Sequence, residues 1–210
     1  MAVRQSPQPL PSDDVSLEGF PVARLQQGRT VLRSHRKTLS PGWRASVTDV
    51  TDADGGRFDL ASPNGTLYVA DDVETAVRER IREKFDGPQT VSATLAGEFE
   101  VSVIAVDGTV DCADVSSGNA ARYGVTRQIE TTEDYTVTHA WAEAFHQTGY
   151  RGVRYGSRFT SGPARAWALF GKAGPCDMTV VRKIAGPVAC RMSGVRVLSP
   201  IDRIEDVTLI

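Results

Sequence analysis

The chain has 210 residues, with 24 Lys and Arg against 26 Asp and Glu, and a formal net charge of −2. This length fits one domain with a substantial core, and the 40% hydrophobic content is ordinary for a soluble globular protein. The near-neutral charge argues against a general attraction to nucleic acid, so no direct nucleic-acid partner is expected. Because no apolar run approaches the ~18 residues of a membrane span, no membrane partner is expected either.

The three cysteines point to a reducing compartment. Cys112, Cys176 and Cys190 are odd in number and lack a Cys-x-x-Cys spacing, which argues against a disulfide framework and a zinc site. The N-terminus shows no apolar segment of a secretory signal. We therefore expect a cytoplasmic protein, and we expect no metal.

The N-terminal segment differs in composition from the rest of the chain. Residues 5–9 and 11–14 are polar and rich in proline, with no apolar period. Such segments do not bury enough apolar surface to order themselves. The sequence predicts a flexible tail over residues 1–25 and one catalytic domain over residues 26–210.

The clearest predicted helix covers residues 72–85, with Asp71 as its cap and Glu74 completing a capping-box pattern. Its apolar stripe includes Val77 and Ile81, and Glu79 lies off that stripe. Glu79 is therefore free to face water or a cleft. A second helix is predicted over residues 137–148.

Short strands make up most of the remaining predicted structure. Alternating or apolar runs predict strands over residues 31–35, 98–106, 150–155, 164–170, 178–184, 195–198 and 206–210. The strands and the few helices do not alternate, which favours an α+β fold with mixed, mainly antiparallel sheets over a doubly wound sheet.

The common motifs of enzymes are missing from the sequence. It has no Gly-rich phosphate cradle, and Ser157 does not lie in a Gly-x-Ser-x-Gly elbow. His139 and His146 could share one helix face, but no second group of metal ligands accompanies them. We interpret both histidines as structural or surface residues.

Four other segments stand out. Arg33 lies on the first strand, and residues 55–58 form a Gly-Gly-Arg-Phe turn. Residues 67–70 read Leu-Tyr-Val-Ala, and Glu79 lies eleven residues after Tyr68. Residues 152–157 read Gly-Val-Arg-Tyr-Gly-Ser. Taken singly, each also fits a purely structural role, as a strand-end arginine, a rim tyrosine, a solvated helix charge or a turn serine.

Taken in order, over residues 30–184, these segments resemble the RES domain family, which is named for its Arg, Glu and Ser. The resemblance includes the helix over residues 134–145 and a strand ending at Ala168-Leu169-Phe170. It implies a fold similar to that of ADP-ribosylating toxins. It also implies a toxin of a bacterial toxin–antitoxin pair that destroys NAD+ by hydrolysis or phosphorolysis.

The resemblance also assigns residue roles. It makes Arg33, Glu79 and Ser157 the Arg, Glu and Ser of the family, with Tyr68 as the pocket tyrosine and Arg57 as a supporting substrate-binding residue.

The chain departs from the family pattern at three positions. Ser34 stands where an aromatic residue is common, Asp59 where Asn is usual, and Gly156 where Pro is frequent. These departures bear on substrate positioning and rate more than on the type of reaction.

The residue types suit cleavage of the nicotinamide–ribose bond. The leaving nicotinamide is neutral and needs no general acid, while a carboxylate such as Glu79 stabilises the oxocarbenium-like ribose. Arginines such as Arg33 hold phosphate oxygens bidentately, and Ser157 can fix the geometry by a hydrogen bond. NAD+ would then be a consumed substrate, and no cofactor is expected.

Three alternatives stay open at the level of sequence. The chain could transfer ADP-ribose to a macromolecule, or it could be a non-catalytic RES-like binding module. The acceptor could be water or phosphate. The expected partners are NAD+ and a cognate antitoxin protein on a separate chain, and formation of a homo-oligomer is also open.

Overall fold

The computed structural model describes residues 8–12, 14–52, 55–82, 84–85 and 89–199. Its centre is an eight-stranded sheet in which neighbouring strands pair antiparallel, except for the parallel pair of β9 and β10. In spatial order the strands are β1 (Val22–Leu25), β9 (Val110–Asp114), β10 (Gly152–Gly156), β11 (Arg165–Lys172), β6 (Asn64–Ala70), β2 (Thr30–Arg36), β8 (Phe99–Ala105) and β13 (Thr179–Ala185).

Smaller ladders and short helices complete the fold. The two-stranded ladders are β3 (Trp43–Arg44) with β12 (Gly174–Pro175), β4 (Ser46–Val47) with β5 (Leu60–Ala61), and β7 (Thr90–Ser92) with β14 (Arg196–Leu198). The helices are α1 (Val73–Ile81), α2 (Ala93–Gly97), the 3₁₀ helix η1 (Gly118–Tyr123), α3 (Gln128–Thr131), α4 (Tyr135–Gln147) and α5 (Gly186–Met192). The predicted α+β class with mainly antiparallel pairing is confirmed.

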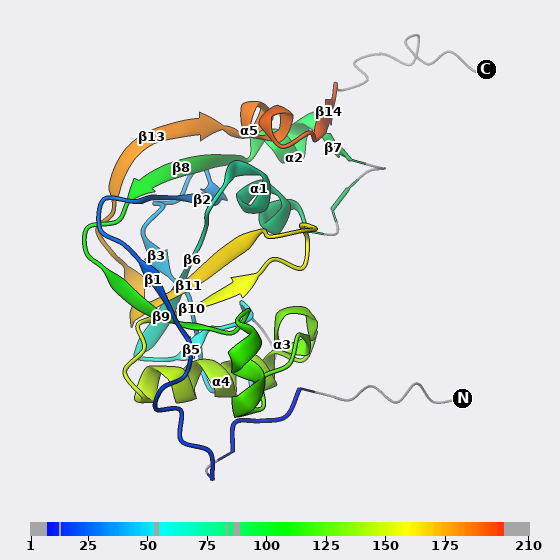
Figure 1. Ribbon diagram of the computed structural model, residues 1–210. Helices are drawn as coiled ribbons and strands as arrows, with labels where there is room; N and C mark the ends of the chain where they lie inside the picture. Colours follow the sequence, from blue (N-terminus) through cyan, green and yellow to red (C-terminus); the bar gives the residue numbers. More distant parts are fainter. Residues whose placement is uncertain (1–7, 13, 53–54, 83, 86–88, 200–210) are drawn as a thin grey trace, which may run out of the picture.

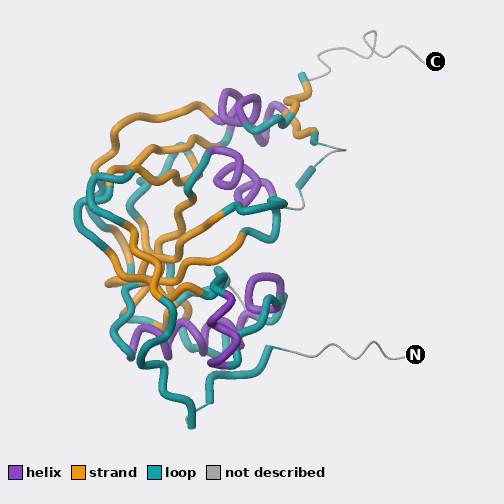
Figure 2. Tube along the Cα trace, in the orientation of Figure 1, coloured by secondary structure: helices purple, strands orange, loops and turns teal. Residues whose placement is uncertain are grey.

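The helices form two groups, one at each end of the curved sheet (Figures 1 and 2). In the first group, α1, α2 and α5 pack with β8 around a core that includes Val77, Ile81 and Phe99. In the second, α4 packs on β10 through Trp141 and Phe145. The strands between the two groups carry Arg33 on β2 and Tyr68 on β6.

The sheet separates between its two halves at the junction of β2 and β6. These strands pair only at Leu32 and Ala70, whereas β2 pairs with β8 along its whole length. Figure 1 shows β2, β8 and β13 in one half and β6, β11 and β10 in the other. Beyond Leu32, β2 leaves β6, so the following residues of β2 face an opening in the sheet.

Helix α1 begins one residue later than the predicted cap. Asp72 is the N-cap, because its Oδ1 accepts from the Thr75 N–H at 2.7 Å and its Oδ2 accepts from the Thr75 hydroxyl at 2.9 Å. The prediction of Asp71 as the cap was wrong. The Asp71 N–H donates to the Arg165 carbonyl at 3.1 Å, which continues the sheet. The Asp71 carboxylate accepts from the Trp167 indole N–H at 2.6 Å.

The same helix also ends earlier than predicted. It stops at Ile81 instead of residue 85, because Arg82 adopts a φ of 53°. The Arg82 backbone N–H donates to the Arg78 carbonyl at 2.8 Å and closes the last turn. Phe85 still packs against the core of the first helix group, as its place in the predicted stripe indicated.

The described part of the predicted tail belongs to the packed domain. Phe20 is 1% exposed and contacts the rings of Phe145 and Tyr150, and β1 pairs with β9. The Trp141 indole N–H donates to the Pro9 carbonyl at 2.8 Å. Aromatic burial and strand pairing therefore begin before residue 26, and the predicted boundary was too late. The proline-rich composition gave no sign of these contacts.

The other predicted elements agree with the structure where it describes them, and the strand predicted over 206–210 lies outside the described residues. The sequence did not predict several observed elements, among them β9, α2 and α5. Cys112, Cys176 and Cys190 are free thiols, as expected. No described helix is long and apolar enough to cross a membrane.

Candidate active site

A cavity of about 490 Å³ opens where β2 separates from β6. Its walls come from β2, β6, α1, the turn over residues 55–59, the start of α4 and the turn after β10. Arg33, Arg57, Tyr68 and Glu79 all line it. The fold therefore brings four of the five predicted site residues to one cavity.

Ser157 joins the group through Glu79. It is 8% exposed and does not itself line the cavity, but its hydroxyl donates a hydrogen bond to the Glu79 carboxylate. The Ser157 Oγ also accepts from the Phe159 N–H at 3.2 Å, which fixes the hydroxyl at the turn. The predicted Glu and Ser thus form a direct pair.

Glu79 carries a perturbed carboxylate. Burial raises its pKa above the ordinary value of 4.5. The Ser157 hydrogen bond and the positive charges of Arg82, Arg57 and Arg158 act in the opposite direction. The neighbouring cations favour the ionised form of Glu79, and the ionised carboxylate is the group that can stabilise a developing positive charge.

Arg33 bridges the opening in the sheet. Its Nη1 donates to the Tyr68 carbonyl of β6 at 3.4 Å and its Nη2 donates to the Trp43 carbonyl of β3 at 3.0 Å. Its buried Nε has no hydrogen-bond partner among the described residues. Burial lowers the pKa of Arg33 to about 10, so the guanidinium keeps its charge at neutral pH and can hold an anion.

Arg57 is fixed from behind by the loop around α3. Its Nη1 donates to the Thr132 carbonyl at 2.7 Å and to the Ile129 carbonyl at 3.3 Å, and its guanidinium lies 5.1 Å from the centre of the Tyr135 ring. Arg57 is 7% exposed. Burial lowers its pKa, but these acceptors and the aromatic face stabilise the cation.

The Tyr68 hydroxyl holds the turn over residues 55–59. It donates to the Asp59 Oδ1 at 2.8 Å and accepts from the Phe58 N–H at 2.8 Å, while the Asp59 Oδ2 accepts from the Gly56 N–H at 2.7 Å. A Cβ on Gly56 would lie 2.6 Å from the Tyr68 hydroxyl, so only glycine allows this approach. Because the hydroxyl proton is directed at Asp59, Tyr68 presents its ring to the cavity.

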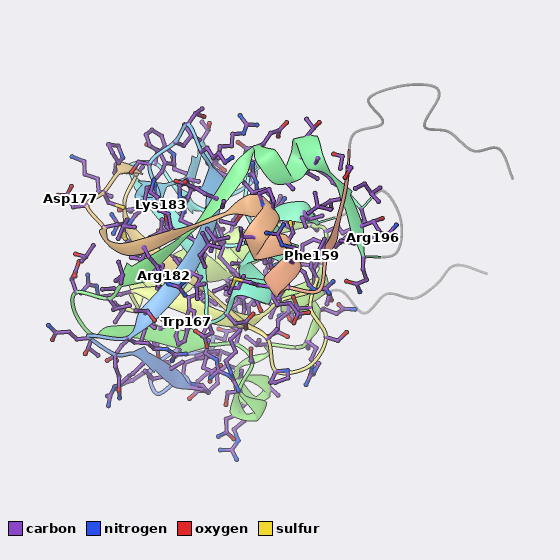
Figure 3. The ribbon with its side chains drawn as sticks, turned by 90° about the horizontal axis from the view of Figure 1, so that it is seen from above. Phe159, Trp167, Asp177, Arg182, Lys183 and Arg196 are labelled. Atoms are coloured by element: carbon purple, nitrogen blue, oxygen red, sulfur yellow. The ribbon has the colours of Figure 1, made fainter. Side chains whose placement is uncertain are left out.

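The cavity lining also includes residues to which the sequence assigned no role in the site. Ser34, which the sequence marked only as a departure from the family pattern, lines the cavity, and its buried hydroxyl has no partner among the described residues. Phe159, labelled in Figure 3, lines the cavity from the turn after β10, with the Arg158 guanidinium 4.8 Å from its ring centre. Six basic side chains line the cavity against the two carboxylates of Asp59 and Glu79: Arg33, Arg57, Arg80, Arg82, Lys84 and Arg158.

A signal for part of this set was present in the sequence. Arg80, Arg82 and Lys84 alternate at the end of the Glu79 helix, but a charged helix end is usually solvated. Arg80 lines the cavity from α1, and the turn of the chain at Arg82 lets Arg82 and Lys84 line it as well.

The histidines do not form a second site. His139 is buried, and its Nε2 lies 2.8 Å from the Gly56 carbonyl, while His146 packs edge-on against Phe170. Within the described part of the chain, no group of three His, Cys, Asp or Glu side chains could hold a metal ion.

Comparison with known proteins agrees with this architecture. The family model described as RES domain matches residues 30–191, which is most of the chain and includes all five predicted site residues. The chain belongs to the RES domain family. No curated protein matches this RES chain in sequence.

A solved structure shares the fold of this RES domain. It is a chain in the crystal structure of the M. tuberculosis MbcT–MbcA toxin–antitoxin complex, with a TM-score of 0.59 and 12% sequence identity. The similarity covers 81% of this chain and 92% of that chain. At this identity the likeness establishes the fold.

Proposed function

We propose that this RES domain degrades NAD+ by cleaving its nicotinamide–ribose bond, as a glycohydrolase or phosphorylase. The observation that carries the proposal is the Glu79 carboxylate, which is half-buried in a cationic cavity and hydrogen-bonded by Ser157. NAD+ offers both charges that such a cavity needs. Its pyrophosphate is anionic, and its reacting ribose becomes positive as the bond breaks.

The basic side chains bind the substrate in this proposal. Arg33 and Arg57 are held rigidly by backbone carbonyls, so their guanidinium planes are ready for phosphate oxygens before NAD+ arrives. Pre-organised donors lose little side-chain entropy on binding. The Tyr68 ring supplies an apolar wall for the nicotinamide.

Bond cleavage then follows from the charge at Glu79. The electron pair of the bond between ribose C1 and the pyridinium nitrogen leaves with the nitrogen and gives neutral nicotinamide. The carboxylate of Glu79 stabilises the cationic ribose, and the Ser157 hydroxyl keeps that carboxylate in place. Water or phosphate then forms the new bond to ribose C1 on the side that nicotinamide has left. When water is the acceptor, it releases its proton to solvent.

The biological role in this proposal is that of a toxin restrained by an antitoxin. Its support is membership in the RES family and the shared fold with a chain of a toxin–antitoxin complex. An enzyme that consumes NAD+ in the cytoplasm has to be restrained in its own cell, so a separate antitoxin chain is the expected partner.

Product analysis tests this function. Purified protein is incubated with NAD+ with and without phosphate, and the products are separated by chromatography. We expect nicotinamide with ADP-ribose from hydrolysis, or with ADP-ribose-1″-phosphate from phosphorolysis. Intact NAD+ under both conditions would overturn the proposal, and label from NAD+ attached to a macromolecule would instead identify an ADP-ribosyltransferase.

A further inference from the structure

Glu130 of α3 ties together three segments behind the cavity. Its Oε1 accepts from the Gly156 N–H at 2.7 Å and from the Ser116 hydroxyl at 2.6 Å. Gly156 is the last residue of β10 and directly precedes Ser157. The turn that carries Ser157 is therefore held by a side chain from a different segment of the chain.

The Gly156 N–H is directed out of the sheet. Gly156 pairs with Arg165 of β11 at the very end of the ladder, and its N–H donates to Glu130. A Cβ on Gly156 would lie 3.1 to 3.3 Å from the Glu130 carboxyl atoms. The Glu130 carboxylate thus packs directly against the backbone that it holds, and it fixes the position of the end of β10.

The same segment also holds the opposite wall of the cavity. The carbonyls of Ile129 and Thr132, on either side of Glu130, accept from Arg57. Residues 129–132 therefore connect Arg57 on one wall with the Ser157 turn on the other. A displacement of the turn against this segment would change the distance between the Glu79–Ser157 pair and the fixed cation.

We propose that Glu130 is a positioning residue, which sets the Ser157 hydroxyl against the Glu79 carboxylate by holding the Gly156 N–H. This inference rests on the proposed NAD+ cleavage. Glu130 lies outside the cavity lining and acts through Gly156 and Ser157. Its loss slows the chemical step and leaves substrate binding by the arginines in place.

The experiment measures kcat and KM for nicotinamide release in four variants. Glu130→Ala lowers kcat by on the order of tenfold or more, because small misplacements of catalytic groups are costly, and leaves KM within about twofold. Glu130→Gln keeps an acceptor oxygen and most of kcat. Ser116→Ala is the matched control, since it removes only the other hydrogen bond to Glu130, and it leaves kcat near wild type.

The decisive variant combines Glu130→Ala with Gly156→Pro. Proline has no N–H to satisfy and fixes φ by its ring, and truncation of Glu130 makes space for that ring. The double variant regains most of the kcat lost in Glu130→Ala. A Glu130→Ala enzyme with wild-type kcat, or a double variant no faster than Glu130→Ala, overturns the proposal.

A second readout separates this proposal from the proposed function. Amide hydrogen exchange at Gly156 accelerates in Glu130→Ala and stays unchanged in Ser116→Ala, whatever the enzyme does to NAD+. Unchanged exchange at Gly156 in Glu130→Ala overturns the positioning role. If the wild-type protein leaves NAD+ intact while exchange at Gly156 accelerates in Glu130→Ala as expected, only the proposed function is contradicted.

Discussion

The Ser157 hydroxyl donates a hydrogen bond to the carboxylate of Glu79, although the two residues are far apart in the chain. Glu79 comes from α1 and Ser157 from the turn after β10, so the pair joins the two halves of the separated sheet. It also places the carboxylate opposite the arginines of the cavity. Catalysis in the proposed function depends on this pair and on its supports.

Replacement of Glu79 by Gln removes the charge and keeps the shape. We expect nicotinamide release to fall by on the order of a hundredfold or more, since preorganised charge stabilisation is a large part of catalysis. The measurement is kcat by nicotinamide release, with circular dichroism as the control for folding. A folded Gln variant with wild-type kcat would contradict the role of Glu79.

Replacement of Ser157 by Ala shifts the acidic limb of the pH–rate profile. The Ser157 hydrogen bond lowers the pKa of Glu79 against the effect of burial. Loss of this hydrogen bond raises the pKa of Glu79 further, so the ionised carboxylate appears only at higher pH. The acidic limb of the profile therefore shifts to higher pH. The rate is measured between about pH 4 and 8. A profile that is lower but unshifted would argue against direct contact of the pair in solution.

Replacement of Arg33 by Lys weakens NAD+ binding. The guanidinium reaches the carbonyls of both Tyr68 and Trp43, whereas an ammonium cannot keep both contacts and also bind a phosphate bidentately. We expect KM to rise about tenfold or more and kcat to change less, with Arg24→Lys, at an exposed ion pair, as the matched control. Equal KM values for the two variants would exclude Arg33 from substrate binding.

Replacement of Tyr68 by Phe reduces stability. The buried Phe58 N–H loses its acceptor and Asp59 loses a donor, which costs about 1–3 kcal/mol in the free energy of unfolding. Urea unfolding measures the change. An unchanged midpoint would show that water replaces the hydroxyl at this turn.

Replacement of Asp59 by Asn flattens the dependence of stability on pH. Burial raises the pKa of Asp59 above 3.8 in the folded state, so the native protein binds this proton more tightly than the unfolded chain does. The wild-type free energy of unfolding therefore falls as pH rises from near 3.8 through the raised native value. Asn does not titrate, so the variant lacks that contribution.

Urea unfolding of both proteins between about pH 4 and 7 measures this difference. The free energy of unfolding of the Asn variant, relative to that of the wild type, should rise from the lower to the upper end of this pH range. Parallel curves would mean that the Asp59 pKa is not raised.

Local signals were sufficient for several elements of the fold. The apolar alternation of residues 98–106 predicted β8, and the apolar stripe containing Val77 and Ile81 predicted α1. These elements depend on side chains close together in sequence. The cap of α1 could not be chosen between Asp71 and Asp72, since the choice depends on Trp167 and Arg165 of β11.

The sheet edges carried weaker signals. Strand β13 bears Arg182 and Lys183, which Figure 3 labels, and its edge position allows both side chains to be exposed. Strand β1 was hidden in a segment that the prolines marked as a tail. Its place in the sheet depends on pairing with β9, almost ninety residues further along the chain.

The sequence by itself determined the residue types of the site and their order, and through them the family. Arg33, Arg57, Tyr68, Glu79 and Ser157 were all proposed as site residues through the resemblance of their segments to the RES domain family. Only the tertiary structure decided that β2 separates from β6, that Ser157 reaches Glu79, and that Glu130 accepts from the Gly156 N–H. These relations depend on contacts between distant segments, and the free energy of such contacts is set by packing, which no local pattern encodes.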